Sequence, residues 1–198
     1  MPLSVVPGFL FYCYITAITP GPANLCSLST AIQFGKKQAL KQWVGLYFGF
    51  MIDSLMAVFV SYFLGAVIGE YVKYLAIVGA LYLIYIAWKM LKSTYDGDIT
   101  QQKKPGFWRG ILVQLTNVKV MMSCLTELTT FVLPYNQKFW VLFLVGIFLT
   151  LTGPIANLVW LFAGVGLRKF FINYTKQVNI VLAVSLLICA VTLILSVF

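Results

Sequence analysis

The chain has 198 residues, of which 61% are hydrophobic and 10% are charged, and its formal net charge is +9. A soluble domain of this size needs more charged residues to cover its surface. The composition therefore excludes a soluble globular domain. The basic residues lie in short clusters between apolar runs, which indicates topology signals and not a nucleic-acid-binding surface. The first apolar run has no basic residues before it, and we therefore expect no cleavable signal peptide.

Six apolar stretches, each long enough to cross a bilayer, follow one another along the chain. They cover residues 4–32, 43–67, 71–91, 108–133, 139–166 and 178–197. We therefore predict an all-α, polytopic membrane protein with six transmembrane helices in a single domain, residues 1–198. A polar loop, residues 93–106, joins its halves, 1–92 and 107–198. Because each half has three spans, the second must enter the membrane inverted, which makes the halves candidates for a 3+3 inverted repeat.

The first span contains the sequence ITPGPANL at Ile18–Leu25. Pro20 and Pro22 have no N–H to donate to the carbonyls of Thr16 and Ile18, so the helix cannot continue regularly. We predict a broken helix: one half ends near Ile18, a PGP link follows, and a second half starts near Pro22. A break at this depth is either packed against protein or lines a cavity.

The cavity interpretation provides a site for a zwitterion. A helix that restarts at Pro22 directs the free N–H groups of Ala23, Asn24 and Leu25 at the gap, where they suit a carboxylate. The carbonyls released upstream would accept hydrogen bonds from an ammonium group. The alternative is that the prolines only shape helix packing. Gly21 between the two prolines, with Asn24 alongside, favours the site.

The second span carries Gly45 and Gly49, whose spacing permits close contact with another helix. Three ionisable residues lie inside spans, Asp53, Lys119 and Glu127. Each costs about 2.5–3.5 kcal/mol at the bilayer centre and so needs a partner or water.

Each of these three residues has two interpretations. Lys119 binds a substrate carboxylate or pairs with Asp53. Asp53 is a proton-coupling group or only the structural partner of Lys119. Glu127 is a second proton-coupling candidate or simply reaches the interface.

Several kinds of chemistry are absent from the sequence. There is no histidine, and Cys13, Cys26, Cys124 and Cys189 form no CxxC motif. We therefore expect no metal site, no cofactor and no enzymatic activity. No GxxxxGK[ST] motif is present, so ATP-driven transport by this chain alone is not expected.

The basic residues also predict orientation. Eleven of the fourteen fall at the first, third and fifth connections, while Lys73 and Lys138 lie at the opposite side and Lys119 lies within a span. The positive-inside rule then places both termini outside the cytoplasm.

The stretches Ile18–Leu25, GALYLIYIAWK at Gly79–Lys89 and QLTNVK at Gln114–Lys119 together resemble the LysE/RhtB family of bacterial amino-acid exporters. Thr129–Pro134 and Gln177–Ala183 are most similar to the cysteine/O-acetylserine exporter branch. The resemblance implies two re-entrant elements, the first formed by Pro20, Gly21, Pro22 and Asn24 and the second by Asn117 and Lys119.

Two departures from the family pattern affect these elements. The usual PGPN reads PGPA, so Ala23 offers no side-chain hydrogen bond. The usual NPK reads NVK, so Val118 does not force a helix break and the fourth span need not be broken.

The resemblance implies a multi-pass protein of the bacterial inner membrane that exports small neutral amino acids, cysteine or O-acetylserine in particular, by proton antiport. Its expected partners are the amino acid, the proton, the lipid bilayer and possible further copies of itself as a homo-oligomer, but no nucleic acid. The alternative is a non-transporting membrane subunit, an assembly factor or anchor whose polar residues only hold helices together.

Overall fold

The structure is a computed structural model that describes residues 1–64, 68–92 and 104–195. Every element in these ranges is a helix. The helices are α1 (Val6–Ile18), α2 (Pro22–Leu64), α3 (Ile68–Leu91), α4 (Phe107–Leu115), α5 (Val118–Phe131), α6 (Phe139–Gly166), α7 (Arg168–Asn173) and α8 (Thr175–Leu195). The all-α prediction is confirmed for these residues.

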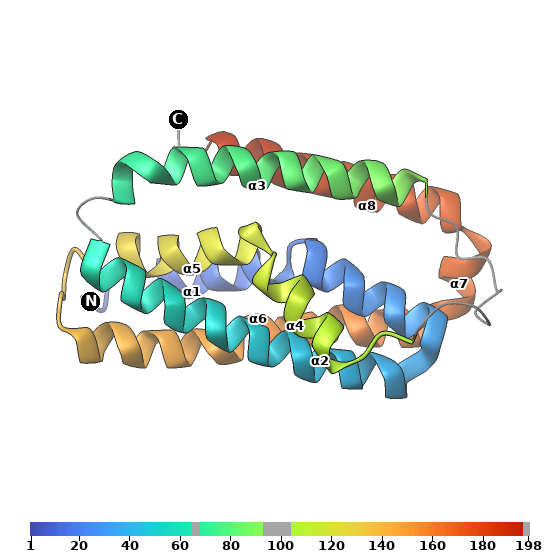
Figure 1. Ribbon diagram of the computed structural model, residues 1–198, viewed down its shortest axis with the longest axis horizontal. Helices are drawn as coiled ribbons and strands as arrows, with labels where there is room; N and C mark the ends of the chain where they lie inside the picture. The colour runs from blue at the N-terminus through green and yellow to red at the C-terminus, as the bar shows by residue number, and fades with distance from the viewer. Residues whose placement is uncertain (65–67, 93–103, 196–198) are drawn as a thin grey trace.

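The helix α2 contains a sharp bend at Gly35, where the backbone has φ 78° and ψ 175°. Only glycine adopts such a conformation readily, because it has no Cβ. The bend separates residues 22–34 from residues 36–64, and the chain reverses its direction there (Figure 1). The second predicted span therefore begins as a helix at residue 36, earlier than residue 43.

A second interruption separates α4 from α5, which are bent by 60° relative to each other. Asn117, between them, has φ −86° and ψ 82°, which is not helical. The sequence left open whether Val118 leaves the fourth span unbroken, and the structure shows a break that precedes Val118 and needs no proline. The Thr116 hydroxyl donates to the carbonyls of Leu112 and Val113, a local bond that competes with continued helix.

Two helical segments of the described chain are long and apolar enough to cross a membrane, Pro22–Phe63 and α6. The bent pair α4 and α5 makes a third if it counts as one span. The remaining predicted spans correspond to α1 with the start of α2, α3 and α8. Most of the predicted loop 93–106 and the ends of the second and sixth spans lie outside the described residues.

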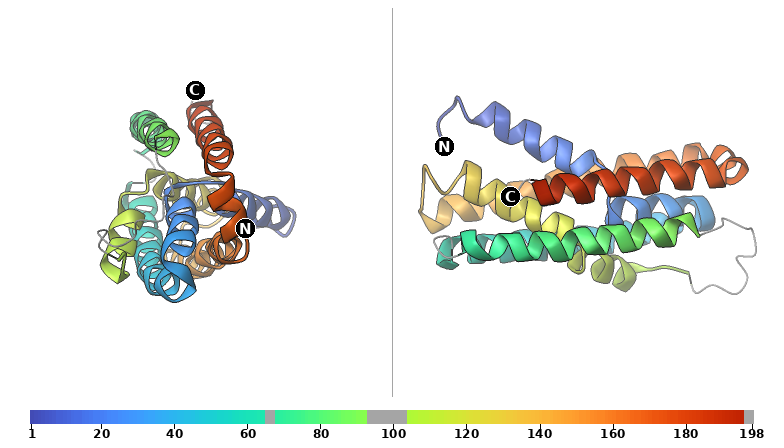
Figure 2. Two further views of the ribbon diagram at one scale, coloured as in Figure 1. Left: turned by 90° about the vertical axis from the view of Figure 1, so that its right-hand side faces the viewer. Right: turned by 90° about the horizontal axis from the view of Figure 1, so that it is seen from above.

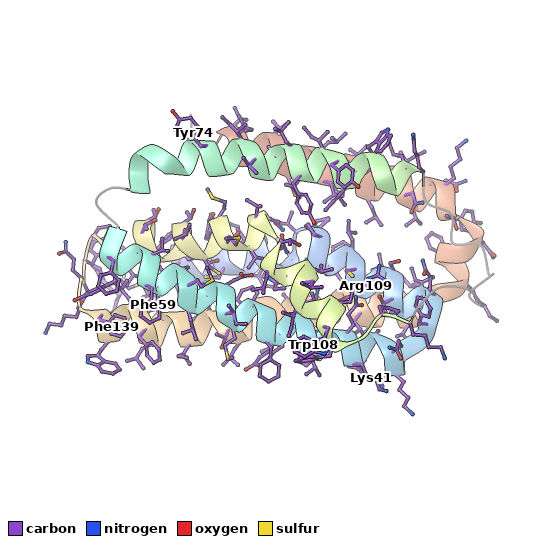
Figure 3. All side chains as sticks on the ribbon, viewed as in Figure 1. Lys41, Phe59, Tyr74, Trp108, Arg109 and Phe139 are labelled. Carbon is purple, nitrogen blue, oxygen red and sulfur yellow. The ribbon has the colours of Figure 1, made fainter. Side chains whose placement is uncertain are left out.

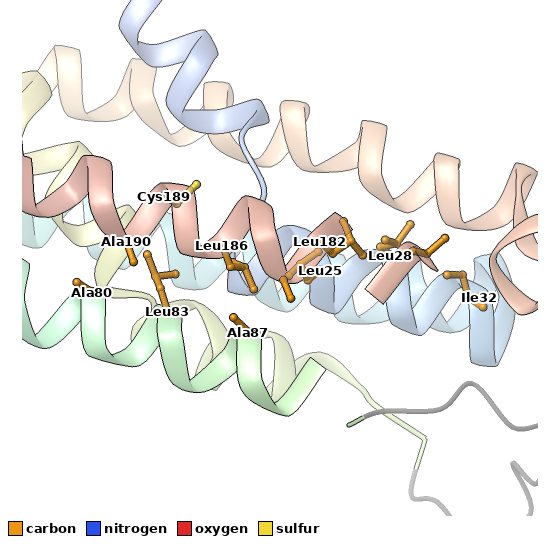
Figure 4. Close-up of a cluster of buried hydrophobic side chains, with 12 residues drawn as sticks. Leu25, Leu28, Ile32, Ala80, Leu83, Ala87, Leu182, Leu186, Cys189 and Ala190 are labelled. Carbon is orange, nitrogen blue, oxygen red and sulfur yellow. The ribbon is translucent and has the colours of Figure 1, made fainter. Parts of the chain in front are cut away.

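The long helices run nearly side by side, with α3 and α8 along one side of the bundle (Figures 1 and 2). One apolar core joins α1, α2, α5 and α6 and includes Cys13, Val58, Leu128 and Leu149. A second core joins the start of α2 to α3 and α8, as Figure 4 shows for Leu28, Leu83 and Leu186. The break after α1 thus connects a helix of the first core to a helix segment of the second.

The predicted close contact of Gly45 and Gly49 is confirmed, and the partner is α4. A Cβ at Gly45 would lie 2.8 Å from the carbonyl carbon of Phe107, and one at Gly49 would lie 2.6 Å from the Cβ of Gln114. Gly110 of α4 faces back, and its Cβ would lie 2.7 Å from the backbone nitrogen of Leu46. These glycines hold α4, and with it the second break, against α2.

We expect Gly45→Ala to destabilise the protein. Alanine favours a helix by about 1 kcal/mol over glycine, but the clash with the backbone of α4 costs about 1–3 kcal/mol. The melting temperature of the purified variant should therefore fall. Gly166→Ala is the matched control, because a Cβ at Gly166, the last residue of α6, meets nothing within 4 Å. Equal melting temperatures for the two variants would contradict this account of the contact.

Candidate functional site

The break after α1 has the position that the sequence predicts. The helix ends at Ile18, Thr19 is extended with φ −61° and ψ 138°, and α2 begins at Pro22. The link therefore spans Thr19 to Gly21, and its residues leave several backbone groups without helical partners.

The carbonyls at this break are already bonded within the protein. The Lys119 ammonium donates to the carbonyls of Thr16 at 2.9 Å and Thr19 at 2.7 Å, with Pro20 at 3.5 Å. The Trp160 indole donates to Ile18 at 3.0 Å. The expectation that these carbonyls face an open gap is therefore wrong for this conformation, because side chains from α5 and α6 donate hydrogen bonds to them.

Lys119 reaches the link because Gly21 leaves room for it. A Cβ at Gly21 would lie 3.0 Å from Lys119 Cδ and 3.4 Å from Nζ. The alternative pairing of Lys119 with Asp53 does not occur here: the Asp53 carboxylate accepts a hydrogen bond from the Gln114 amide at 3.2 Å. Lys119 thus caps the carboxyl end of α1, where a cation is favourable.

Asn24 fixes the two sides of the break relative to each other. Its amide nitrogen donates to the carbonyls of Ala17 and Thr19, both at 3.0 Å. Its amide oxygen accepts from Asn157 of α6 at 2.8 Å, and the oxygen of Asn157 accepts from Ser27 at 2.6 Å. Both asparagines are buried, so their amides are rigidly oriented.

The amino end of α2 presents free donors. The N–H of Leu25 bonds to the carbonyl of Gly21. Within the described ranges, no acceptor takes a hydrogen bond from the N–H of Ala23 or Asn24. Such donors at a helix start, with its positive dipole end, suit an anion.

The second break supplies an acceptor. Asn117 is 1% exposed, and its amide oxygen has no hydrogen-bond partner in the described part of the chain. An unpaired buried polar atom costs about 1–3 kcal/mol, so its presence calls for a ligand or water.

These groups surround one cavity of about 40 Å³. Among the residues that line it are Gly21, Ala23, Asn24, Asn117, Lys119 and Asn157. A buried water needs roughly 10–15 Å³, so the cavity holds a few waters and must widen to admit an amino acid. The two breaks, at residues 19–21 and 116–117, lie near the middle of the long axis (Figure 1).

Both predicted proton-coupling residues are buried near this cavity. Asp53 is linked to it through Gln114, which lines the cavity. Glu127 accepts a hydrogen bond from the Thr16 hydroxyl at 3.3 Å. It is 4% exposed, so the alternative in which it reaches the interface is wrong. No ion pair forms to either carboxylate from the described basic residues.

Two partners of the break, Asn157 and Trp160, are absent from the predicted site. They are three residues apart and therefore on the same face of α6. An asparagine inside an otherwise apolar span was the available signal, since buried polar groups in membrane helices seek partners. Which backbone groups they would meet could not be predicted without the fold.

The sequence was also compared with known proteins. The profile of the LysE type translocator matches residues 14–197, which is nearly the whole chain. The chain belongs to the LysE family. Cysteine/O-acetylserine efflux proteins of Escherichia coli K12 and Shigella sonnei are each 36% identical to this LysE-family chain over 189 residues, covering 95% of it and 96% of the relative. No solved structure matches the chain.

Membership of the LysE family confirms the resemblance seen in the motifs of the first and fourth spans. It identifies a membrane translocator and not an enzyme. The departures PGPA and NVK lie at the two breaks that line the cavity, at Ala23 and Val118. Despite both departures, this LysE-family protein has a broken helix at each position.

Proposed function

We propose that this LysE-family protein exports small neutral amino acids, cysteine or O-acetylserine in particular, from the bacterial cytoplasm by proton antiport. The single observation that carries the proposal is the cavity at which two broken helices meet, with donors and an acceptor on its wall. The names of the relatives, which are similar over nearly the full length, support the choice of substrate.

The carboxylate of the substrate binds at the start of α2. The N–H groups of Ala23 and Asn24 are free there, and Lys119 lies beside them at Gly21. Its contact with the Pro20 carbonyl is the longest of the three at 3.5 Å, so this N–H is the one that turns to the substrate while the bonds to Thr16 and Thr19 remain. Pro20 and Pro22 lack the backbone N–H groups that would join the two helix halves into one continuous helix.

The ammonium of the substrate binds the amide oxygen of Asn117. This oxygen is buried, lacks a partner in the described residues and belongs to a residue on the cavity wall. The released carbonyls, the acceptors predicted from the sequence, are taken by Lys119, Trp160 and Asn24 in this conformation. The zwitterion thus lies between the two breaks and not along one of them.

The coupling proton binds Asp53 or Glu127. A charge at the bilayer centre costs about 2.5–3.5 kcal/mol, and a carboxylate avoids this cost by binding a proton. Glu127 shares its cavity with Lys119, whereas Asp53 acts through Gln114. Either residue can therefore make the occupancy of the site depend on protonation.

The arrangement in the membrane is a 3+3 inverted repeat of six spans in the inner membrane. The two breaks support it, because they fall at corresponding places in the two halves. Lys41 and Arg109 lie toward one end of the bundle, away from Phe59 and Phe139 (Figure 3). This end is the cytoplasmic one by the positive-inside rule.

The orientation predicts the result of reporter fusions. A reporter fused after Phe198 should report a position outside the cytoplasm. A reporter inserted at Gln101 should report a position inside it. An alkaline phosphatase and a fluorescent protein at the same two positions provide reciprocal readouts. Cytoplasmic activity at Phe198 would contradict the six-span arrangement.

Transport itself is tested by uptake of labelled O-acetylserine into inverted membrane vesicles, with and without an imposed pH gradient. We expect uptake that depends on the protein and increases when the vesicle interior is acidic. Vesicles lacking the protein are the control. Purified protein in liposomes that takes up no amino acid under either condition would favour the alternative, a non-transporting subunit.

A further inference from the structure

A second cavity, of about 30 Å³, adjoins the proposed binding cavity. The two share part of their walls, including Thr16, Phe50, Lys119 and Gly153. The second cavity extends along α5 from Lys119 toward Glu127. The two cavities are therefore neighbours, and Lys119 lies in the wall of both.

The wall of the second cavity carries small polar side chains. The Ser123 hydroxyl donates to the carbonyl of Lys119 at 2.9 Å, and that of Thr152 donates to Leu149 at 2.9 Å. Each hydroxyl therefore donates its hydrogen bond within its own helix, and its oxygen can still accept one from a group in the cavity. Such a wall accepts a hydrogen bond from a thiol or hydroxyl. The two ionisable groups on it are Lys119 at one end and Glu127 at the other.

The aromatic ring of Phe50 borders both cavities and packs directly on α6 at Gly153. A Cβ at Gly153 would lie 2.6 Å from Phe50 Cζ, so only glycine lets the ring take this position. Phe50 is buried and belongs to the core formed by α1, α2, α5 and α6. The ring thus has little freedom to yield to a large ligand.

We propose that the second cavity is the side-chain subsite of the exporter and that Phe50, positioned by Gly153, sets the largest side chain it accepts. This inference rests on the proposed function, because it places the substrate's carboxylate and ammonium in the first cavity. The distance along α5 from Lys119 to Ser123 is about 6 Å, one helical turn. The space therefore suits short side chains and excludes aromatic ones.

The test compares the uptake of labelled serine and phenylalanine into inverted vesicles, per folded molecule. Phe50→Ala removes the ring, and we expect the ratio of phenylalanine to serine uptake to rise about tenfold or more, the effect typical of altered apolar pockets. Phe48→Ala is the matched control: Phe48 is exposed, lies two residues away on α2 and should leave the ratio unchanged. If Phe50→Ala does not fold, Phe50→Leu should shift the ratio in the same direction.

Gly153→Ala tests the opposite direction. Its Cβ pushes the Phe50 ring into the shared space, so uptake of O-acetylserine should fall about tenfold relative to serine. An unchanged ratio in folded Phe50→Ala and Phe50→Leu protein, beside active wild type, would overturn the subsite and leave the proposed function intact. Wild-type vesicles that take up no amino acid would overturn both.

Discussion

Lys119→Met is expected to remove most of the transport at substrate concentrations near the half-saturating value of the wild type. The ammonium of Lys119 is the only described cation on the cavity wall, and it lies at the link where the substrate carboxylate is proposed to bind. A charge-assisted hydrogen bond contributes about 1.5–3 kcal/mol, so the half-saturating concentration of substrate should rise by about tenfold to a hundredfold. Uptake into inverted vesicles at fixed substrate concentration measures the loss.

The same variant should also lose some stability. Without the ammonium, the carbonyl of Thr16 loses its bond from Lys119, whereas Thr19 keeps its bond from Asn24. Transport must therefore be expressed per folded molecule, counted by gel filtration of the solubilised protein. Lys138→Met, which removes an exposed lysine at the start of α6, is the control. Normal transport per folded Lys119→Met molecule would remove Lys119 from the site.

Asn117→Leu is expected to have opposite effects on stability and transport. Leucine has a similar size and lacks the unpaired amide oxygen, so its burial should maintain or raise the melting temperature. Transport should fall strongly, because the proposed ammonium acceptor is gone. Thermal melting and vesicle uptake on the same preparation separate the two effects.

The matched comparison is the same substitution at Asn157. The amide of Asn157 is fully engaged, donating to Asn24 and accepting from Ser27. Asn157→Leu leaves Asn24 and Ser27 without these hydrogen bonds. It should therefore lower the melting temperature, whereas Asn117→Leu should not. A destabilised Asn117→Leu protein that transports normally per folded molecule would show that Asn117 only holds helices together.

Much of the fold follows from the sequence because long apolar runs leave few alternatives. The predicted span 139–166 has the bounds of α6, and the third predicted span ends with α3 at Leu91. The break at Pro20 and Pro22 is also predictable, since proline removes a backbone donor whatever its surroundings. The bend at Gly35 is not, because glycine permits a positive φ without requiring it.

The sequence indicates some residues of the candidate site, but it misses Asn157 and Trp160 and does not predict the contacts. The sequence indicates that Lys119, Asp53 and Glu127 each need a partner, because charges are costly in a membrane. Which partner each finds depends on helix packing: Lys119 reaches the end of α1, and Asp53 reaches Gln114. The contact between α2 and α4 at Gly49 brings Gln114 to Asp53, and this register is set by three-dimensional packing.

The central claim is that the cavity holds the two charged ends of an amino acid, the carboxylate at α2 and the ammonium at Asn117. Competition against labelled O-acetylserine uptake in inverted vesicles tests it most directly, with serine, serine methyl ester and N-acetylserine as competitors. The ester lacks the carboxylate, and the N-acetyl derivative lacks the ammonium. We predict that serine competes and that neither derivative does at the same concentration. Competition by either derivative as strong as that by serine would contradict the claim.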